Sequence, residues 1–227
     1  MFAFADTCTV PASPIHARRL LLASLAAAAI APLAGCGRKA PGAQAQPPGT
    51  TVLALGDSLT SGVGASAEAA YPAVLQRLTG WNVVNGGVSG DTSAQALTRL
   101  PALLQAHEPA LVIVSIGGND FLRRQSATTT RANVRQICVD AQASGAQVLL
   151  VAVPELTMLA AVGRLKDHDL YEDIASELNI SLHSKGWAGV LAQERMRSDQ
   201  IHANAAGYEQ FAQGLVETLK ETGLLAR

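Results

Sequence analysis

Four short apolar runs follow one another along the chain after residue 50, and segments with helical periodicity separate them. The runs cover residues 51–55, 81–84, 110–116 and 147–153, and each is nearly continuous and rich in Val, Ile or Leu. Runs of this length and composition are typical of strands that are buried on both faces of a sheet. Residues 178–182 form a weaker candidate for a fifth strand.

Apolar residues recur at helical spacing between these runs, in segments 67–78, 92–106, 130–143, 170–178 and 204–219. Asp91 or Thr92 is placed to cap the second segment, and Gly145 marks the end of the third. Alternating strands and helices predict an α/β fold with a mostly parallel sheet and helices on both faces. Right-handed crossovers then bring all the strand-to-helix loops to one edge, where ligands bind.

The first 35 residues have the composition of an export signal. Arg18 and Arg19 precede an apolar run over residues 20–34, and this run ends in the sequence LAGC, which contains Cys36. A basic start, a short apolar core and small residues at the end predict a secretory signal peptide over residues 1–35. The run is shorter than the ~20 residues that a membrane-spanning helix needs.

LAGC resembles the lipobox of bacterial lipoproteins, which implies that Cys36 becomes the lipidated first residue after cleavage. The alternative is an ordinary signal peptide that happens to contain a cysteine. The arginine pair also resembles a twin-arginine export signal weakly. Gly37, rather than Asp, follows the cysteine. In lipoproteins of this kind that favours the outer membrane, so we expect a lipid-anchored protein on the periplasmic side of the cell envelope.

Residues 37–50 are rich in Gly, Pro, Ala and Gln. Such a segment buries too little apolar surface to fold, so residues 36–50 are interpreted as a lipidated cysteine followed by a flexible tether. The remaining residues, 51–227, have an ordinary length for one compact domain.

Composition excludes some classes of function. The net charge is −1 and no basic stripe is present, so nucleic-acid binding has little support. Aromatic residues make up 4% of the chain, which argues against a stacking platform for bases or sugars. Cys138 lies alone in a helical segment and is expected to be a buried structural residue. No zinc motif or Cys/His cluster is present, so no metal and no cofactor are expected.

Polar, glycine-bearing loops follow the predicted strands. They read GDS at residues 56–58, NGGVSGD at 85–91 and GGND at 117–120, and DQIH at 199–202 precedes the last helix. Acyl transfer needs a nucleophile, a base, a group that orients the base, and donors for the developing oxyanion. These four loops supply every one of those residue types at one edge of the sheet.

Ser58 is the candidate nucleophile and His202 the candidate base, because His202 alone among the five histidines has a carboxylate, Asp199, three residues earlier in a loop at the expected edge. That carboxylate would fix the imidazole tautomer and stabilise the imidazolium. Taken alone, the Asp-x-x-His spacing is better explained as a helix N-cap beside a surface histidine.

Three donors are candidates for the oxyanion: the backbone N–H groups of Ser58 and Gly90 and the side-chain amide of Asn119. Glycine at position 90 allows the backbone to approach a ligand closely. Taken alone, Gly90 and Asn119 are typical of tight turns.

Together, GDSLTSG with Ser58, SGD with Gly90, GGND with Asn119 and DQIH with Asp199 and His202 resemble the motifs of the SGNH, or GDSL, hydrolase family, in the family's order. The stretches VNGGVSGDTSAQALTRLPALL and IVSIGGNDFLR resemble its small bacterial esterase, thioesterase and lysophospholipase subgroup. The resemblance covers essentially all of residues 51–227.

The resemblance implies a flavodoxin-like three-layer α/β/α sandwich with a five-stranded parallel sheet in the order 2-1-3-4-5. It also implies that Ser58 is the nucleophile, that His202 is the general base and then the acid, and that Asp199 orients His202. The oxyanion hole would be formed by the N–H groups of Ser58 and Gly90 and by the Asn119 amide.

The expected function is that of a serine esterase that hydrolyses acyl esters, of the arylesterase, lysophospholipase or acyl thioesterase type. Residues 153–164 carry several apolar side chains and either line an acyl-chain groove or belong to the core. The alternative enzyme is a carbohydrate O-deacetylase of the cell envelope. The alternative from another class is a non-catalytic, flavodoxin-like binding module, for which residues 58–62 would imitate a phosphate loop.

Overall fold

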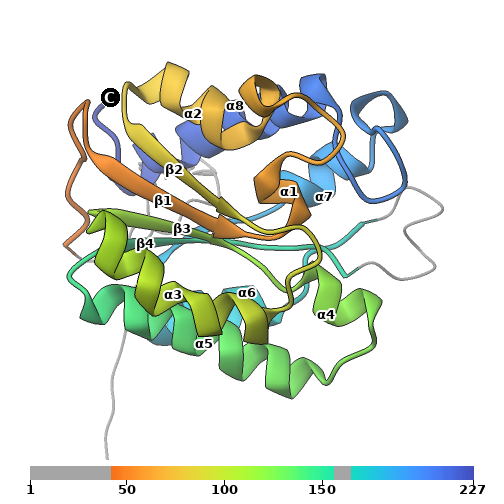
Figure 1. The fold of residues 1–227 in the computed structure, drawn as a ribbon, viewed down its shortest axis with the longest axis horizontal. Coiled ribbons are helices and arrows are strands. Elements are labelled where there is room, and N and C mark those ends of the chain that lie inside the picture. Colours follow the sequence, from red (N-terminus) through yellow and green to blue (C-terminus); the bar gives the residue numbers. More distant parts are fainter. Residues whose placement is uncertain (1–41, 156–164) are drawn as a thin grey trace, which may run out of the picture. The chain divides into compact units, whose positions relative to one another are not determined.

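The computed structural model describes residues 42–155 and 165–227, and five parallel strands form the centre of this part of the chain (Figure 1). The strands are β1 (Thr51–Gly56), β2 (Asn82–Gly87), β3 (Leu111–Ser115), β4 (Gln147–Val151) and β5 (Ser181–His183). Their order in the sheet is β2-β1-β3-β4-β5, with every neighbouring pair parallel. The expected fold class and strand order are confirmed.

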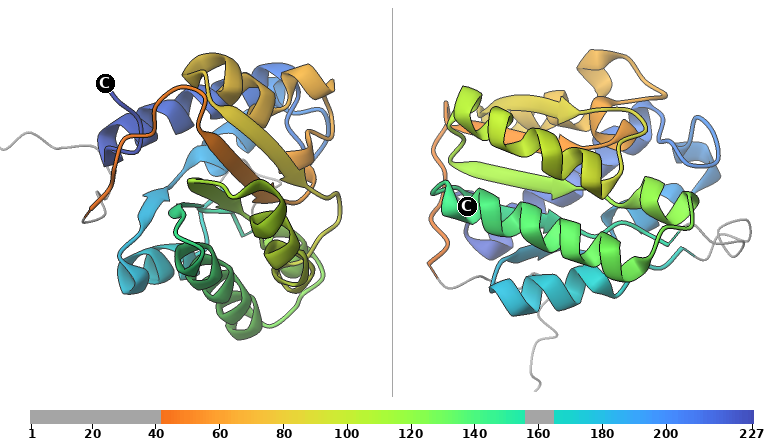
Figure 2. Two further views of the ribbon diagram at one scale, coloured as in Figure 1. Left: turned by 60° about the vertical axis from the view of Figure 1, so that its left-hand side comes forward. Right: turned by 60° about the horizontal axis from the view of Figure 1, so that its bottom comes forward.

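Helices cover both faces of the sheet (Figures 1 and 2). One face carries α2 (Tyr71–Thr79), α7 (Gly186–Leu191) and α8 (Ala205–Thr222), and the other carries α3 (Ser93–His107), α5 (Ala127–Ala143) and α6 (Leu170–Leu178). Short elements complete the described part, namely α1 (Ser58–Ser61), α4 (Gly118–Leu122), η1 (Ala67–Ala69) and η3 (Glu194–Met196). None of the helices in this part of the chain is both long and apolar enough to cross a bilayer.

Each helix that borders the candidate site begins or ends on an identifiable local interaction. Thr92 caps α3 in a capping box with Gln95, so the side chain of each residue bonds the backbone N–H of the other. Asn204 caps α8 by accepting from the N–H of Gly207. These caps fix where the helices start relative to the loops that precede them.

The central strands are buried on both faces as their continuous apolar sequences predict. β1, β3 and β4 contribute fully buried side chains to one core cluster, in which the ring of Trp187 stacks on Phe211 with centroids 3.6 Å apart. The indole of Trp187 also donates to Ser115 Oγ over 3.0 Å. Cys138 is fully buried, as expected, and burial raises the pKa of its thiol to about 12.

Some boundaries differ from those that the sequence predicts. β2 extends to Gly87, because its pairing with β1 continues as far as Gly56. It is half-exposed, because it lies at the edge of the sheet. β5 begins at Ser181 rather than at residue 178, because α6 continues to Leu178 and ends at Asn179 in the left-handed conformation. The short helices α1, α4 and α7 have no periodic apolar pattern of useful length and were not predicted.

Residues 42–50 also differ from the expectation of a flexible tether. They lie against the domain, where the backbone N–H of Gln46 donates to the carbonyl of Leu224 over 2.8 Å and that of Gly49 to the carbonyl of Gly80 over 2.8 Å. The composition of this segment does not predict these contacts, because its backbone makes most of them.

Candidate active site

Ser58 stands at the first position of α1, directly beyond the carboxyl end of β1. Asp57 caps this helix, since its Oδ1 accepts the N–H of Leu59 over 3.0 Å. The turn is tight: a Cβ added to Gly56 would lie 2.0 Å from Thr60 Oγ1, so only glycine fits there. The local sequence therefore presents the Ser58 hydroxyl at the edge of the sheet.

His202 reaches this hydroxyl from the loop before α8, with its Nε2 3.0 Å from Ser58 Oγ. Its other ring nitrogen, Nδ1, lies 2.7 Å from Asp199 Oδ2. The other carboxylate oxygen of Asp199 accepts the backbone N–H groups of Ile201 and His202, each over 2.8 Å. One oxygen of Asp199 thus shapes the loop while the other holds the imidazole.

The environment keeps Asp199 ionised. Partial desolvation opposes its charge, but hydrogen bonds from the His202 ring and from the N–H groups of Ile201 and His202 outweigh it, so the pKa of Asp199 lies below its usual value. An ionised carboxylate at Nδ1 directs the imidazole lone pair at Nε2 toward Ser58.

The three expected oxyanion donors follow three different strands at this edge: Ser58 begins α1, Gly90 lies in the loop after β2, and Asn119 lies in α4. Gly90 has φ +84°, a left-handed conformation that glycine adopts without strain. Within the described residues, the N–H groups of Ser58 and Gly90 donate no hydrogen bond. The Asn119 amide donates to the carbonyl of Asp91 over 2.9 Å and makes a long contact of 3.5 Å with Asp57 Oδ2. The second amide hydrogen is therefore only weakly engaged.

Two arginines that no sequence motif marks bind the segments around these donors. Arg99 donates to Asp91 Oδ2 over 2.6 Å and to the carbonyl of Gly56 over 2.8 Å, which joins the loop after β2 to the end of β1. Arg123 donates to the carbonyl of Gly90 over 2.9 Å. Both arginines bind backbone groups or residues that are remote in sequence, so no spacing pattern predicts these contacts.

The Asn119 loop has its own buried support in the next residue. Asp120 is fully buried and accepts from the N–H of Ser93 over 2.8 Å and from its hydroxyl over 2.5 Å. Thr130 adds a contact of 3.3 Å to the same carboxylate, and Asn133 donates to Ser93 Oγ over 3.0 Å. This network joins α4 to the starts of α3 and α5.

A small hollow adjoins Ser58, and most of its wall is apolar. The apolar residues that line it are Leu59, Leu122, Val153, Pro154, Leu191 and Ile201. Val153 and Pro154 begin the segment 153–164, which is expected either to line an acyl-chain groove or to belong to the core. Residues 156–164 of that segment lie outside the described residues.

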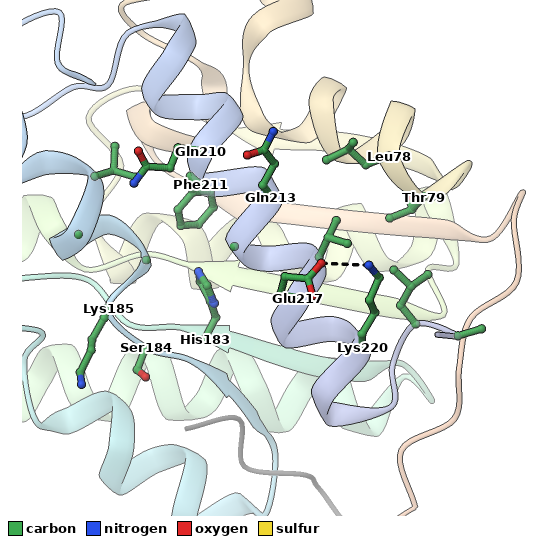
Figure 3. A pocket seen from close by; sticks show the side chains of 17 residues that line it. Leu78, Thr79, His183, Ser184, Lys185, Gln210, Phe211, Gln213, Glu217 and Lys220 are labelled. Carbon is green, nitrogen blue, oxygen red and sulfur yellow. Dashed lines mark hydrogen bonds and ion pairs between the residues drawn. The ribbon is translucent and has the colours of Figure 1, made fainter. Parts of the chain in front are cut away.

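A much larger hollow, of about 890 Å³, lies on the α8 side of β5 and contains none of the expected site residues (Figure 3). His183 borders it, with Nδ1 2.7 Å from Thr218 Oγ1. Burial lowers the pKa of His183 to about 4, so this ring stays neutral at ordinary pH. The size of a cavity is therefore a poor guide to the chemistry here, and His202 remains the histidine beside Ser58.

A serine hydroxyl, an imidazole and a carboxylate in one hydrogen-bonded series, set at the carboxyl ends of parallel strands, define the site of a serine hydrolase. Residues 54–210 match the GDSL-like Lipase/Acylhydrolase family. The chain belongs to this family, also called the SGNH hydrolases, and it is a serine hydrolase of ester bonds.

Characterised relatives agree in class. The chain is 41% identical over 162 residues to Thioesterase 1/protease 1/lysophospholipase L1 of Escherichia coli K12, which covers 68% of this chain and 76% of that protein. It is 33% identical over 183 residues to Esterase TesA of Pseudomonas aeruginosa, covering 75% of this chain and 88% of that protein. A crystal structure of TesA superimposes with a TM-score of 0.67 and 32% identity, over 76% of this chain and 99% of that chain.

The raised pKa of Asp57, the residue before Ser58, can be tested through the pH dependence of stability. Burial raises the pKa of this carboxyl from 3.8 to about 6, which corresponds to a destabilisation of roughly 3 kcal/mol when the group is ionised in the folded protein. This destabilisation is absent below about pH 4, where the carboxyl is protonated in both states. It grows between about pH 4 and 6 and is complete above pH 6. Asp57→Asn keeps an oxygen acceptor for the N–H of Leu59 but carries no charge.

The Asp57→Asn variant should therefore become more stable relative to the wild type as the pH rises from 4 to 8. The difference between their free energies of unfolding should change by about 3 kcal/mol in favour of the variant. Denaturant titrations of both proteins at several pH values measure the difference. A difference that stays constant across this range contradicts the assignment of a raised pKa to Asp57.

Proposed function

We propose that Ser58 is the nucleophile of this esterase, that His202 is its general base and acid, and that Asp199 orients and stabilises His202. The single observation that carries the proposal is the continuous series of hydrogen bonds from Asp199 Oδ2 through both nitrogens of His202 to Ser58 Oγ, at 2.7 and 3.0 Å. Such a series is what activation of a serine hydroxyl requires.

In the first half of the reaction, His202 Nε2 takes the proton of Ser58 as Oγ bonds to the acyl carbon of the substrate. The carbonyl oxygen becomes an oxyanion, and the imidazolium is stabilised by Asp199. Collapse of this intermediate breaks the bond from the acyl carbon to the alcohol oxygen or thiol sulfur. The leaving group takes the proton from His202, and the acyl group stays on Ser58.

In the second half, a water molecule gives a proton to His202 Nε2 and attacks the acyl-enzyme. The new oxyanion collapses, the bond from Ser58 Oγ to the acyl carbon breaks, and His202 returns its proton to Oγ. A carboxylic acid leaves, and the enzyme regains its starting protonation state.

The N–H groups of Ser58 and Gly90 and the amide of Asn119 are the proposed donors to the oxyanion. The absence of other acceptors for both N–H groups among the described residues supports this role. For Asn119, the bond to the Asp91 carbonyl would be kept while the long contact with Asp57 is exchanged for the oxyanion. Charge that develops at this point is stabilised by donors that are already in place.

The proposed substrates are acyl esters, acyl thioesters or lysophospholipids with an apolar acyl part. The apolar wall beside Ser58 supports this class, as do two exposed large apolar side chains at the same edge, Val88 after β2 and Leu122 at the end of α4. The relatives named as a thioesterase, a lysophospholipase and an esterase point in the same direction. A carbohydrate O-deacetylase would instead need a polar surface for sugar hydroxyls.

We place the enzyme in the cell envelope, on the periplasmic side, held by a lipid on Cys36. The LAGC sequence and the preceding basic and apolar segments support this location, and Gly37 supports the outer membrane over the inner one.

Ser58→Ala should abolish covalent labelling by a fluorophosphonate probe, because the probe forms its bond with the activated hydroxyl. Labelling is read from a fluorescent gel band of the intact protein. Ser61→Ala is the matched control, since it removes a neighbouring hydroxyl of α1 that donates to the Ser58 carbonyl, and it should label normally. Labelling that survives in Ser58→Ala would overturn the assignment of the nucleophile.

Asn119→Ala should lower kcat by ~10²–10³ with little change in KM, because an oxyanion donor acts mainly on the transition state. Steady-state kinetics with p-nitrophenyl butyrate measure both parameters. Asn133→Ala serves as the control, since it removes an amide from the buried support of the same loop without removing a donor from the site. Equal losses of kcat in the two variants would assign Asn119 to loop structure instead.

A series of p-nitrophenyl esters separates the two enzyme classes. An esterase with an apolar acyl site should hydrolyse butyrate and octanoate at least as efficiently as acetate, because each buried methylene stabilises the bound acyl chain by about 0.8 kcal/mol. kcat/KM is measured for each chain length, with Ser58→Ala as the blank. A strict preference for acetate would support the O-deacetylase.

A further inference from the structure

Residues 43–50, here called the strap, are fastened to the domain at several points. Gln147, the first residue of β4, holds Gln44 twice: its Oε1 accepts the N–H of Gln44 and its Nε2 donates to the carbonyl of Gln44, both over 2.8 Å. Gln46 pairs with the end of the chain beyond α8, through a bridge to Leu225 and a bond to the Leu224 carbonyl. The strap is thus a docked segment.

Further contacts hold the middle of the strap. The indole of Trp81 donates to the carbonyl of Gln46 over 3.2 Å, and the N–H of Gly49 bonds the carbonyl of Gly80. Ala43 packs on the core cluster. Pro47 and Pro48 restrict the backbone between these points, which lowers the entropy lost when the strap docks.

These attachment points lie at the amino ends of the strands. Gln147 opens β4, Gly80 and Trp81 immediately precede β2, and the strap itself leads into Thr51, the first residue of β1. Ser58 lies beyond the opposite end of β1 (Figure 1, where the strap and α1 are at opposite ends of the strand). At ~3.3 Å per residue, β1 alone separates the two edges by about 17 Å.

The connection from the strap to the proposed lipid site is short. Gly42 is six residues after Cys36. Six residues span at most about 22 Å even when fully extended, whatever conformation they take. That reach exceeds the length of β1 by only about 5 Å, and a path to the catalytic edge must also pass around flanking helices that are each about 10 Å thick.

We propose that the docked strap turns the catalytic edge away from the membrane that anchors the protein, so that its substrates are single-chain acyl esters in the aqueous phase rather than lipids of its own leaflet. This inference rests on the proposed lipidation of Cys36 and on the proposed esterase site. Lysophospholipids and short esters fit the class because they leave bilayers readily, whereas diacyl lipids do not.

The orientation is tested without reference to activity. The lipidated full-length protein is reconstituted in phosphatidylcholine vesicles that contain a fluorescent acceptor lipid, and a donor dye is attached at one added cysteine. Val88→Cys labels the catalytic edge, and Ala143→Cys, at the end of α5 before β4, labels the opposite edge. The buried Cys138 does not compete for the dye.

Energy transfer to the acceptor lipid should be stronger from position 143 than from position 88. Insertion of a twelve-residue Gly/Ser linker between Pro41 and Gly42 should reduce this difference, and the same linker after Arg227 should leave it unchanged. Equal transfer from both positions in the unmodified protein overturns the proposal. A protein that is not retained by the vesicles overturns the lipidation and this inference together.

Activity gives the second readout, with one fluorogenic butyrate ester in two forms. In one form the ester is free in solution, and in the other it is attached to the headgroup of a diacyl phospholipid in the vesicle that holds the enzyme. The unmodified protein should cleave the attached ester at least tenfold more slowly than the linker variant, while both cleave the soluble ester equally. Loss of activity on the soluble ester would contradict the proposed function and leave the energy-transfer result to decide the orientation.

Gln147→Ala tests the strap itself, because it removes both bonds to Gln44 without altering the length of the chain. It should raise the rate on the attached ester and leave the soluble rate unchanged. Gln136→Ala, which removes an exposed glutamine of α5 that bonds Asp140, is the matched control and should change neither rate. Equal rates on the attached ester for the unmodified protein and the linker variant overturn the proposal.

Discussion

The parallel pairing of β1 with both β2 and β3 is the constraint on which the rest of this structure depends. Because the strands run the same way, their carboxyl ends meet at one edge, and the loops that carry Ser58, Gly90 and Asn119 emerge side by side. His202 arrives at the same edge from the loop before α8 and closes a hydrogen bond to a serine 144 residues away. The geometry of the candidate site is thus a consequence of sheet direction, and the bonds of Arg99, Arg123 and Asp120 fix the loops and helix ends around it.

Two aspartates near Ser58 differ in burial, and their pKa values shift in opposite directions. Asp57 is buried, and its pKa is raised to about 6, so its ionised form is costly; its hydrogen bond to Leu59 serves the turn. Asp199 is largely exposed and accepts three hydrogen bonds, so its pKa is lowered and its charge is available to the imidazole. The carboxylate nearest in sequence to the serine therefore bonds its own turn, and the distant one bonds the imidazole that contacts the serine.

The two edges of the sheet serve different purposes. The carboxyl edge holds the candidate catalytic groups, and the amino edge holds the strap through Gln147, Trp81 and Gly80. The strap and the candidate site are therefore separated by the length of the strands. For a protein that is exported and anchored, this separation would determine which molecules can reach the site.

Short-range signals in the sequence predict the strands, the layers and the candidate site residues: continuous apolar runs, glycine-rich loops at strand ends, and an Asp-x-x-His pair. The strand order came from the resemblance of these motifs to the SGNH family, because no local pattern states which strands pair. Only the tertiary structure decided which further residues hold those loops in place, that β2 is a half-exposed edge strand, and that residues 43–50 are docked. Arg99, Gln147 and the strap act through backbone carbonyls and N–H groups of remote segments. Every residue offers the same backbone groups, so the sequence has no pattern to mark such contacts, and only the folded chain brings the partners together.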